Sequence, residues 1–162
     1  MTETEFYQRQ EVLREAISWL GTPYHHAARV KGEGIDCAWF LADVFANTGL
    51  IPRQASEYYP PDWHIHQTEE RYLNRVLQFA DLISTQEEID AWRAGGDLPR
   101  APLPADVVMF DFGKCRAHGA IVFTWPQLVH AQIKSRVELV EAYHATLREK
   151  FAGVYRYKGW AV

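Results

Sequence analysis

The stretch GIDCAWFLADVF, residues 34–45, places a cysteine directly after an aspartate and at the start of a run with helical spacing. Apolar residues recur along it at intervals of three and four, and the Asn-Thr-Gly sequence at 47–49 then supplies a stop signal. Asp36 is therefore predicted to be the N-cap and Cys37 the first helical residue. Cys37 is then either a small buried hydrophobe that completes the apolar face of the helix, or a reactive thiol.

Outward from this helix, the chain divides into a helical part and a strand-rich part. The spacing of apolar residues predicts helices over 4–20, 69–81 and 87–93. From Asp106 onward, runs rich in β-branched and aromatic residues predict five strands, at 106–112, 119–124, 127–131, 137–140 and 154–157. These strands are too closely spaced for crossover helices, so we expect a mainly antiparallel sheet and an α+β fold with N-terminal helices packed on it.

Composition limits the class of protein. The chain has 162 residues, 48% of them hydrophobic and 23% charged, which predicts one folded domain over residues 1–162. A net charge of -4 without a cluster of Lys or Arg argues against nucleic acid as a partner. The polar, acidic N-terminus and the absence of a long apolar run predict no signal peptide and no membrane span, and so synthesis in the cytoplasm.

No metal or other cofactor is predicted. The two cysteines, Cys37 and Cys115, form no CxxC pair, so neither a disulfide framework nor a zinc ribbon is indicated. His64 and His66 would share one face of an extended segment, but no third ligand stands at a suitable spacing. Cys115 is predicted to be a loop thiol, and an oxidation partner for Cys37 only if the two approach each other.

A nucleophilic cysteine needs a lowered thiol pKa, a base and donors for the oxyanion. A helix N-terminus and an imidazolium would both lower the pKa of Cys37, whereas the neighbouring carboxylate of Asp36 would raise it unless that charge caps the helix. His118, predicted at the start of a strand, is the candidate base. His130 lies on the next predicted strand and could orient His118 if the two strands form a hairpin. Taken alone, His118 could also be a loop histidine without a partner, and His130 a structural one.

Four stretches, in order, resemble motifs of the NlpC/P60 family of papain-like cysteine peptidases, which cut bacterial cell-wall peptides. They are WLGTPY (19–24), GIDCAWF (34–40), LPADVVMF (103–110), and HGAIV (118–122) followed by LVHA (128–131). The resemblance covers 12–49 and 103–131. The segment between them, an insertion at about 53–103, resembles the phage-tail and prophage branch of the family.

The resemblance implies a Cys-His-His triad made of Cys37 as nucleophile, His118 as base and His130 as the third, orienting residue. It also implies that Tyr24 lines the site near the oxyanion and that Asp36 lies near the amine of the substrate.

This sequence departs from the family pattern next to the cysteine. Ala38 and Trp39 stand where the family usually has Ser-Gly, and Ala105 stands where a glycine usually precedes Asp106. Because Trp39 is far bulkier than glycine, we expect a reshaped or partly closed pocket. His25 and His26 are adjacent, would point apart, and are predicted at the rim beside the cysteine. With Tyr24 and Asp36, we expect His25, Ala38 and Trp39 to contact the substrate.

The expected function is that of a cysteine hydrolase, a peptidase or amidase acting on peptidoglycan stem peptides. The resemblance implies the bond between γ-D-glutamate and diaminopimelate. Two alternatives stay open: a non-enzymatic phage-tail assembly or binding module on the same fold, and a Cys-His acyltransferase or thioesterase. The expected partners are the stem peptide and, for the phage branch, tail proteins. We expect action at the cell wall, as a phage tail component or a released effector.

Overall fold

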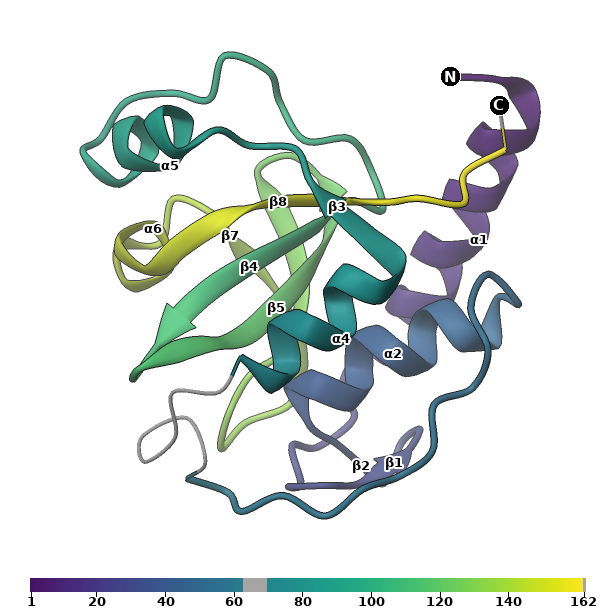
Figure 1. Cartoon of the computed structure of the whole chain (residues 1–162). Helices are drawn as coiled ribbons and strands as arrows, with labels where there is room; N and C mark the ends of the chain where they lie inside the picture. Colours follow the sequence, from purple (N-terminus) through teal and green to yellow (C-terminus); the bar gives the residue numbers. More distant parts are fainter. Residues whose placement is uncertain (63–69, 162) are drawn as a thin grey trace.

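The structure, a computed structural model, describes residues 1–62 and 70–161, and its centre is a six-stranded antiparallel sheet with helices on both faces (Figure 1). The order across the sheet is β3-β8-β4-β5-β6-β7. These strands are β3 (Ala80–Leu82), β8 (Phe151–Tyr157), β4 (Val107–Phe112), β5 (Cys115–Thr124), β6 (Gln127–Ala131) and β7 (Val137–Glu141). The α+β fold predicted from the sequence is confirmed.

Helices α1 (Glu3–Ser18), α2 (Cys37–Asn47) and α4 (Arg71–Phe79) cover one face of the sheet. Helices α5 (Gln86–Arg93) and α6 (Ala145–Lys150) cover the other. A two-stranded ribbon, β1 (Arg29–Val30) and β2 (Gly34–Ile35), lies beside the start of α2. The predicted layer of N-terminal helices is therefore present. The helix predicted at 87–93 is α5, and together with α6, which was not predicted, it covers the other face.

The central strands are buried on both faces because their side chains alternate between two apolar cores. On β4, Val107 and Met109 face the core under α1, α2 and α4, whereas Val108 and Phe110 face the core under α5 and α6. This explains why the run at 106–112 is almost continuously apolar.

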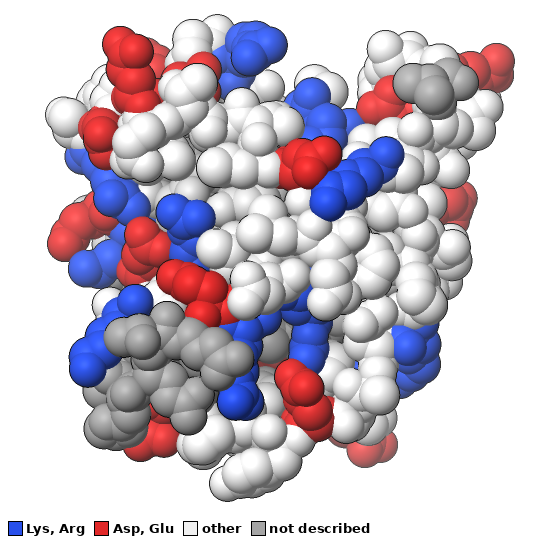
Figure 2. Space-filling view, in the orientation of Figure 1, with Lys and Arg blue, Asp and Glu red and all other residues white. Residues whose placement is uncertain are grey.

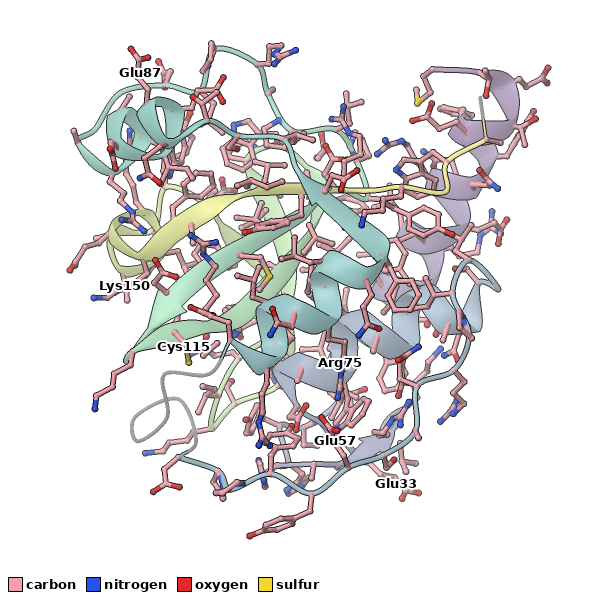
Figure 3. All side chains as sticks on the ribbon, viewed as in Figure 1. Glu33, Glu57, Arg75, Glu87, Cys115 and Lys150 are labelled. Carbon is pink, nitrogen blue, oxygen red and sulfur yellow. The ribbon has the colours of Figure 1, made fainter. Side chains whose placement is uncertain are left out.

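Two boundaries differ from the predicted ones and bear on the site. A tight turn at Gly113 and Lys114 joins β4 directly to β5, so β5 begins at Cys115, four residues earlier than predicted. Cys115 is therefore a buried strand residue and not a loop thiol (Figure 3). The predicted helix at 69–81 ends at Phe79, because Ala80–Leu82 pair with β8 as a short edge strand.

The start of β4 is fixed by a buried carboxylate. Asp106 is fully buried and accepts hydrogen bonds from the Leu103 amide (2.9 Å), the Arg9 guanidinium (3.1 Å) and the Arg156 guanidinium (2.9 and 2.6 Å). Ala105 before it has a φ of 66°, in the left-handed region that favours glycine. A glycine before the aspartate, as in the NlpC/P60 pattern, would suit this backbone. Through Arg9 and Arg156, the aspartate links α1 to β8.

Charged side chains of both signs are scattered over the face shown in Figure 2, without a large field of one sign. None of the described helices combines the length and hydrophobicity needed to cross a bilayer.

Candidate active site

Asp36 caps helix α2, as predicted. Its Oδ1 accepts a hydrogen bond from the Trp39 amide (2.9 Å), which places Cys37 in the first turn. The other oxygen, Oδ2, accepts from the Ala27 amide (2.7 Å) and from the Tyr59 hydroxyl. Both oxygens of the Asp36 carboxylate thus accept hydrogen bonds from the chain itself. A contact between Asp36 and the amine of a substrate would require one of these hydrogen bonds to break.

Cys37 and His118 line the same pocket, together with Tyr24 and Ala38. The Cys37 thiol donates to the carbonyl of Ala117, with 3.6 Å between sulfur and oxygen. From the other side, the hydroxyl of Tyr72 on α4 donates to the Cys37 carbonyl (3.0 Å). The structure therefore brings together the predicted nucleophile, the predicted base and two of the predicted substrate contacts.

The thiol is in its neutral form in this arrangement. Burial, and then the nearby charge of Asp36, raise the pKa of Cys37 to about 12. The backbone amides of Cys37 and Ala38 at the helix start act in the opposite direction and are outweighed. The expectation of a lowered thiol pKa is therefore not met in this structure, because the sulfur is buried.

His118 and His130 form the pair that the predicted hairpin would allow. Nε2 of His118 lies 2.8 Å from Nδ1 of His130, and both rings are buried. Burial, reinforced for His118 by its neighbour His130, lowers the pKa of His118 to about 3 and that of His130 to about 4. Both imidazoles are thus neutral at neutral pH, which is the form in which a histidine can accept a proton.

The hydrogen bond leaves one nitrogen of each ring without a partner in the described structure. His118 Nδ1 is buried and unpaired, and His130 Nε2 is buried with the Glu138 carboxylate 3.8 Å away. If His130 Nε2 carries a proton towards Glu138, then His130 Nδ1 accepts from His118 Nε2, and His118 Nδ1 is a free acceptor. This tautomer leaves Nδ1 as the basic atom of His118.

A β-bulge sets the position of His118. Phe110 pairs with His118 and Asp111 pairs with Arg116, so Ala117 is an extra residue on β5. Ala117 and His118 consequently both line the Cys37 pocket, although they are consecutive in a strand. One bulge thus supplies both the carbonyl that holds the thiol and the candidate base.

Trp39 does not enter the pocket, contrary to the expectation from its bulk. Its side chain is fully buried on another side of α2, where the guanidinium groups of Arg29 and Arg75 lie 4.0 and 4.5 Å from its ring. Arg29 is in turn paired with the buried Asp43. The helix turns by about 100° per residue, so a side chain two positions after Cys37 faces away from the thiol.

The structure also separates the two adjacent histidines. His25 is exposed and is not among the pocket residues, whereas His26 lines the pocket and its Nε2 lies 2.7 Å from the Tyr59 carbonyl oxygen. Of the two histidines predicted at the rim, His26 thus lines the pocket and His25 does not.

Tyr59 and Pro61 also line the pocket, and neither was predicted as a site residue, because they stand in an aromatic, proline-rich segment without a periodic pattern. His64 and His66 lie outside the described residues. Within the described ranges, no group of three or more His, Cys, Asp or Glu side chains is placed to hold a metal ion.

No known family profile and no curated protein matches this sequence. Solved structures do match. An NlpC/P60 family protein from Bacillus cereus is 20% identical, with a TM-score of 0.60 over 92% of this chain and 40% of that one. The NlpC/P60 domain of the peptidoglycan hydrolase SagA is 15% identical, with a TM-score of 0.53 over 91% of this chain and 97% of that one. The peptidoglycan hydrolase RipB from Mycobacterium tuberculosis is 16% identical, with a TM-score of 0.54 over 96% of this chain and 67% of that one.

These similarities identify the fold: the chain has the papain-like NlpC/P60 fold. It spans less than half the length of the Bacillus cereus protein.

Proposed function

We propose that this chain is a cysteine hydrolase of the NlpC/P60 type that cuts an amide bond in peptidoglycan stem peptides, with Cys37, His118 and His130 as its triad. One observation carries the proposal: Cys37 and His118 line one pocket while His118 Nε2 is held by His130 and Nδ1 is left unpaired. A base held at one nitrogen and free at the other is what thiol activation requires.

The chemistry follows from these positions. His118 Nδ1 accepts the proton of the Cys37 thiol as the sulfur attacks the carbonyl carbon of the substrate. The backbone amides at the start of α2 are placed to stabilise the oxyanion. The tetrahedral intermediate collapses to a thioester, and the leaving amine takes the proton from His118. His118 then activates a water molecule that hydrolyses the thioester and restores the thiol.

The substrate class rests on the fold and on its relatives. SagA and RipB, both similar in structure, are named as peptidoglycan hydrolases. We infer a stem peptide as the substrate and, from the sequence resemblance, the γ-D-glutamyl–diaminopimelate bond as the site of cleavage. The phage-tail setting and the action at the cell wall stay predictions from the sequence.

A second candidate is acyl transfer or thioester hydrolysis by the same Cys-His pair, since the first chemical step is shared. An apolar groove between α2 and α4, open to solvent, adjoins the site, and Ala38 lines both the groove and the Cys37 pocket. Incubation with short-chain acyl thioesters tests this candidate, and we expect slower turnover than with stem peptides.

The test is the release of fragments from a purified muropeptide, followed by mass spectrometry. We expect the wild-type chain and Cys115→Ala to release the same fragments, and Cys37→Ala and His118→Ala to release none above background. Full activity of Cys37→Ala would refute the nucleophile. Fragments produced by cleavage at another amide would keep the mechanism and correct the bond.

A further inference from the structure

Residues 54–62, here called the strap, contain no helix or strand and cross the first turn of α2 beside Cys37. Tyr59 is the residue of the strap that makes the most direct contacts there. Its hydroxyl donates to Asp36 Oδ2, and its carbonyl lies 2.7 Å from His26 Nε2. Its ring packs edge-on against the His26 ring, with 4.7 Å between centroids.

The strap is anchored at its other end through Trp39. Arg29 donates to the Gln54 carbonyl (2.7 Å), and Arg75 forms an ion pair with Glu57. Figure 3 shows Arg75 and Glu57 close together below α4. Both guanidinium groups also stack on the Trp39 ring. Trp39 thus does not enter the pocket, but it helps to position the two arginines that hold the strap.

The thiol is not open to a substrate while the strap is in this position. Cys37 is only 8% exposed, yet attack requires a carbonyl carbon within about 3–3.5 Å of the sulfur. Part of the pocket wall cannot move cheaply, since Ala38 belongs to α2, and Phe112, Ala117 and His118 belong to the sheet. Tyr59 and Pro61 belong to the strap, which has no regular structure, and the contacts of Tyr59 with Asp36 and His26 tie the strap to the first turn of α2.

We propose that Tyr59 is a gate residue: its hydrogen bond to Asp36 holds the strap over Cys37, and the thiol can be reached only when that bond breaks. The proposal rests on the proposed function in that Cys37 is the nucleophile. The burial that raises the pKa of Cys37 includes this cover, so opening the gate both admits the substrate and restores water to the thiol.

The experiment measures how fast iodoacetamide alkylates Cys37 at pH 8, by mass spectrometry of the labelled peptides. The variants are Tyr59→Phe, which removes only the hydroxyl, and Tyr59→Ala, which also removes the ring. Tyr58→Phe is the matched control, because Tyr58 is the neighbouring strap residue, is 84% exposed and does not line the pocket. Cys115, which is buried in β5, reports unfolding in the same samples.

Loss of a hydrogen bond to a charged group should shift the equilibrium between the covering and the open position of the strap by a factor on the order of ten. We expect Tyr59→Phe to accelerate the labelling of Cys37 about tenfold, Tyr59→Ala to accelerate it at least as much, and Tyr58→Phe to leave it unchanged. Labelling of Cys37 at the wild-type rate in Tyr59→Phe would overturn the gate, whatever the rate in Tyr59→Ala, because the hydrogen bond would then not hold the strap. A parallel rise at Cys115 would overturn it too, because the cause would then be a loosened fold.

The alkylation rate needs no peptide substrate, so it stands apart from the test of the proposed function. If Cys37→Ala kept full hydrolysis, the proposed function would fail while the labelling result still described access to the thiol. If hydrolysis depended on Cys37 but the Tyr59 variants labelled at the wild-type rate, only the gate would fail.

Discussion

Acidification from pH 7 to pH 5 should destabilise the fold through His118 and His130. Both rings are buried and neutral, with the pKa of His118 lowered to about 3 and that of His130 to about 4. In the unfolded chain both would titrate near the usual pKa of about 6.5. Because the unfolded state binds protons first, the stability contributed by the neutral pair is complete above pH 6.5 and is lost as the pH falls towards the folded values.

The magnitude follows from these pKa values. At pH 5, a histidine in the unfolded chain is almost fully protonated, whereas neither ring in the folded chain is. This difference in proton binding lowers the free energy of unfolding by about 2 kcal/mol for each residue. The two side chains are 4% and 1% exposed, so screening by solvent reduces this little. The pair should thus remove about 4 kcal/mol from the free energy of unfolding between pH 7 and pH 5, a range in which most carboxylates stay ionised.

Urea unfolding at the two pH values, followed by tryptophan fluorescence, measures this loss in the wild type and in a His118→Gln/His130→Gln double variant. We expect the pH-dependent loss to fall by most of the 4 kcal/mol in the double variant, whatever its stability at pH 7. His25→Gln is the control, because His25 is exposed and should leave the loss unchanged. Equal losses in the wild type and the double variant would refute the buried, neutral pair.

Three further perturbations have defined outcomes. Asp106→Asn should lower the free energy of unfolding by about 3–5 kcal/mol, because it removes the buried carboxylate that pairs with the buried Arg9 and with Arg156, whereas Asp111→Asn, with a partly exposed partner, should cost under about 1 kcal/mol in the same urea titration. Glu138→Ala should lower kcat for muropeptide cleavage about tenfold with little change in KM, because the Glu138 carboxylate, 3.8 Å from His130 Nε2, favours the tautomer that leaves His118 Nδ1 free to accept a proton. An unchanged kcat would show that Glu138 plays no part in positioning the histidine pair. Gly119→Ala should lower the free energy of unfolding by about 1–3 kcal/mol, since an added Cβ would lie 2.6 Å from a side-chain carbon of Leu41 on α2. A lowered thermal midpoint would report this loss.

Local patterns of sequence predicted the elements that carry the candidate triad. The cap at Asp36, the start of α2 at Cys37 and the strand of His130 depend on neighbouring residues, which a sequence displays directly. The start of β5 was predicted too late, because its first residues pair with β4 around a two-residue turn and include a bulge. The edge strand β3 has three residues, too few for a periodic pattern.

The covering of the site could not be predicted, because it depends on contacts between distant residues. The direction of Trp39 is set by Arg29 and Arg75, which lie 10 positions before it and 36 positions after it in the numbering. Tyr59 reaches Asp36 from a segment without regular structure, and such a segment has no pattern from which to infer its path. The raised thiol pKa comes from burial and from the charge of Asp36, and the extent of burial likewise depends on contacts between residues far apart in the sequence.

The bulge at Ala117 makes the site depend on the length of β5 as well as on the identity of its residues. Since Phe110 pairs with His118 and Asp111 with Arg116, deleting Ala117 would join two positions that are already in register with β4. The ladder would become regular and His118 would keep its pairing, but the thiol would lose the carbonyl that holds it. A shortening by one residue would therefore remove the bulge that lets Ala117 and His118 line the same pocket, a change that no exchange of one side chain for another can produce here.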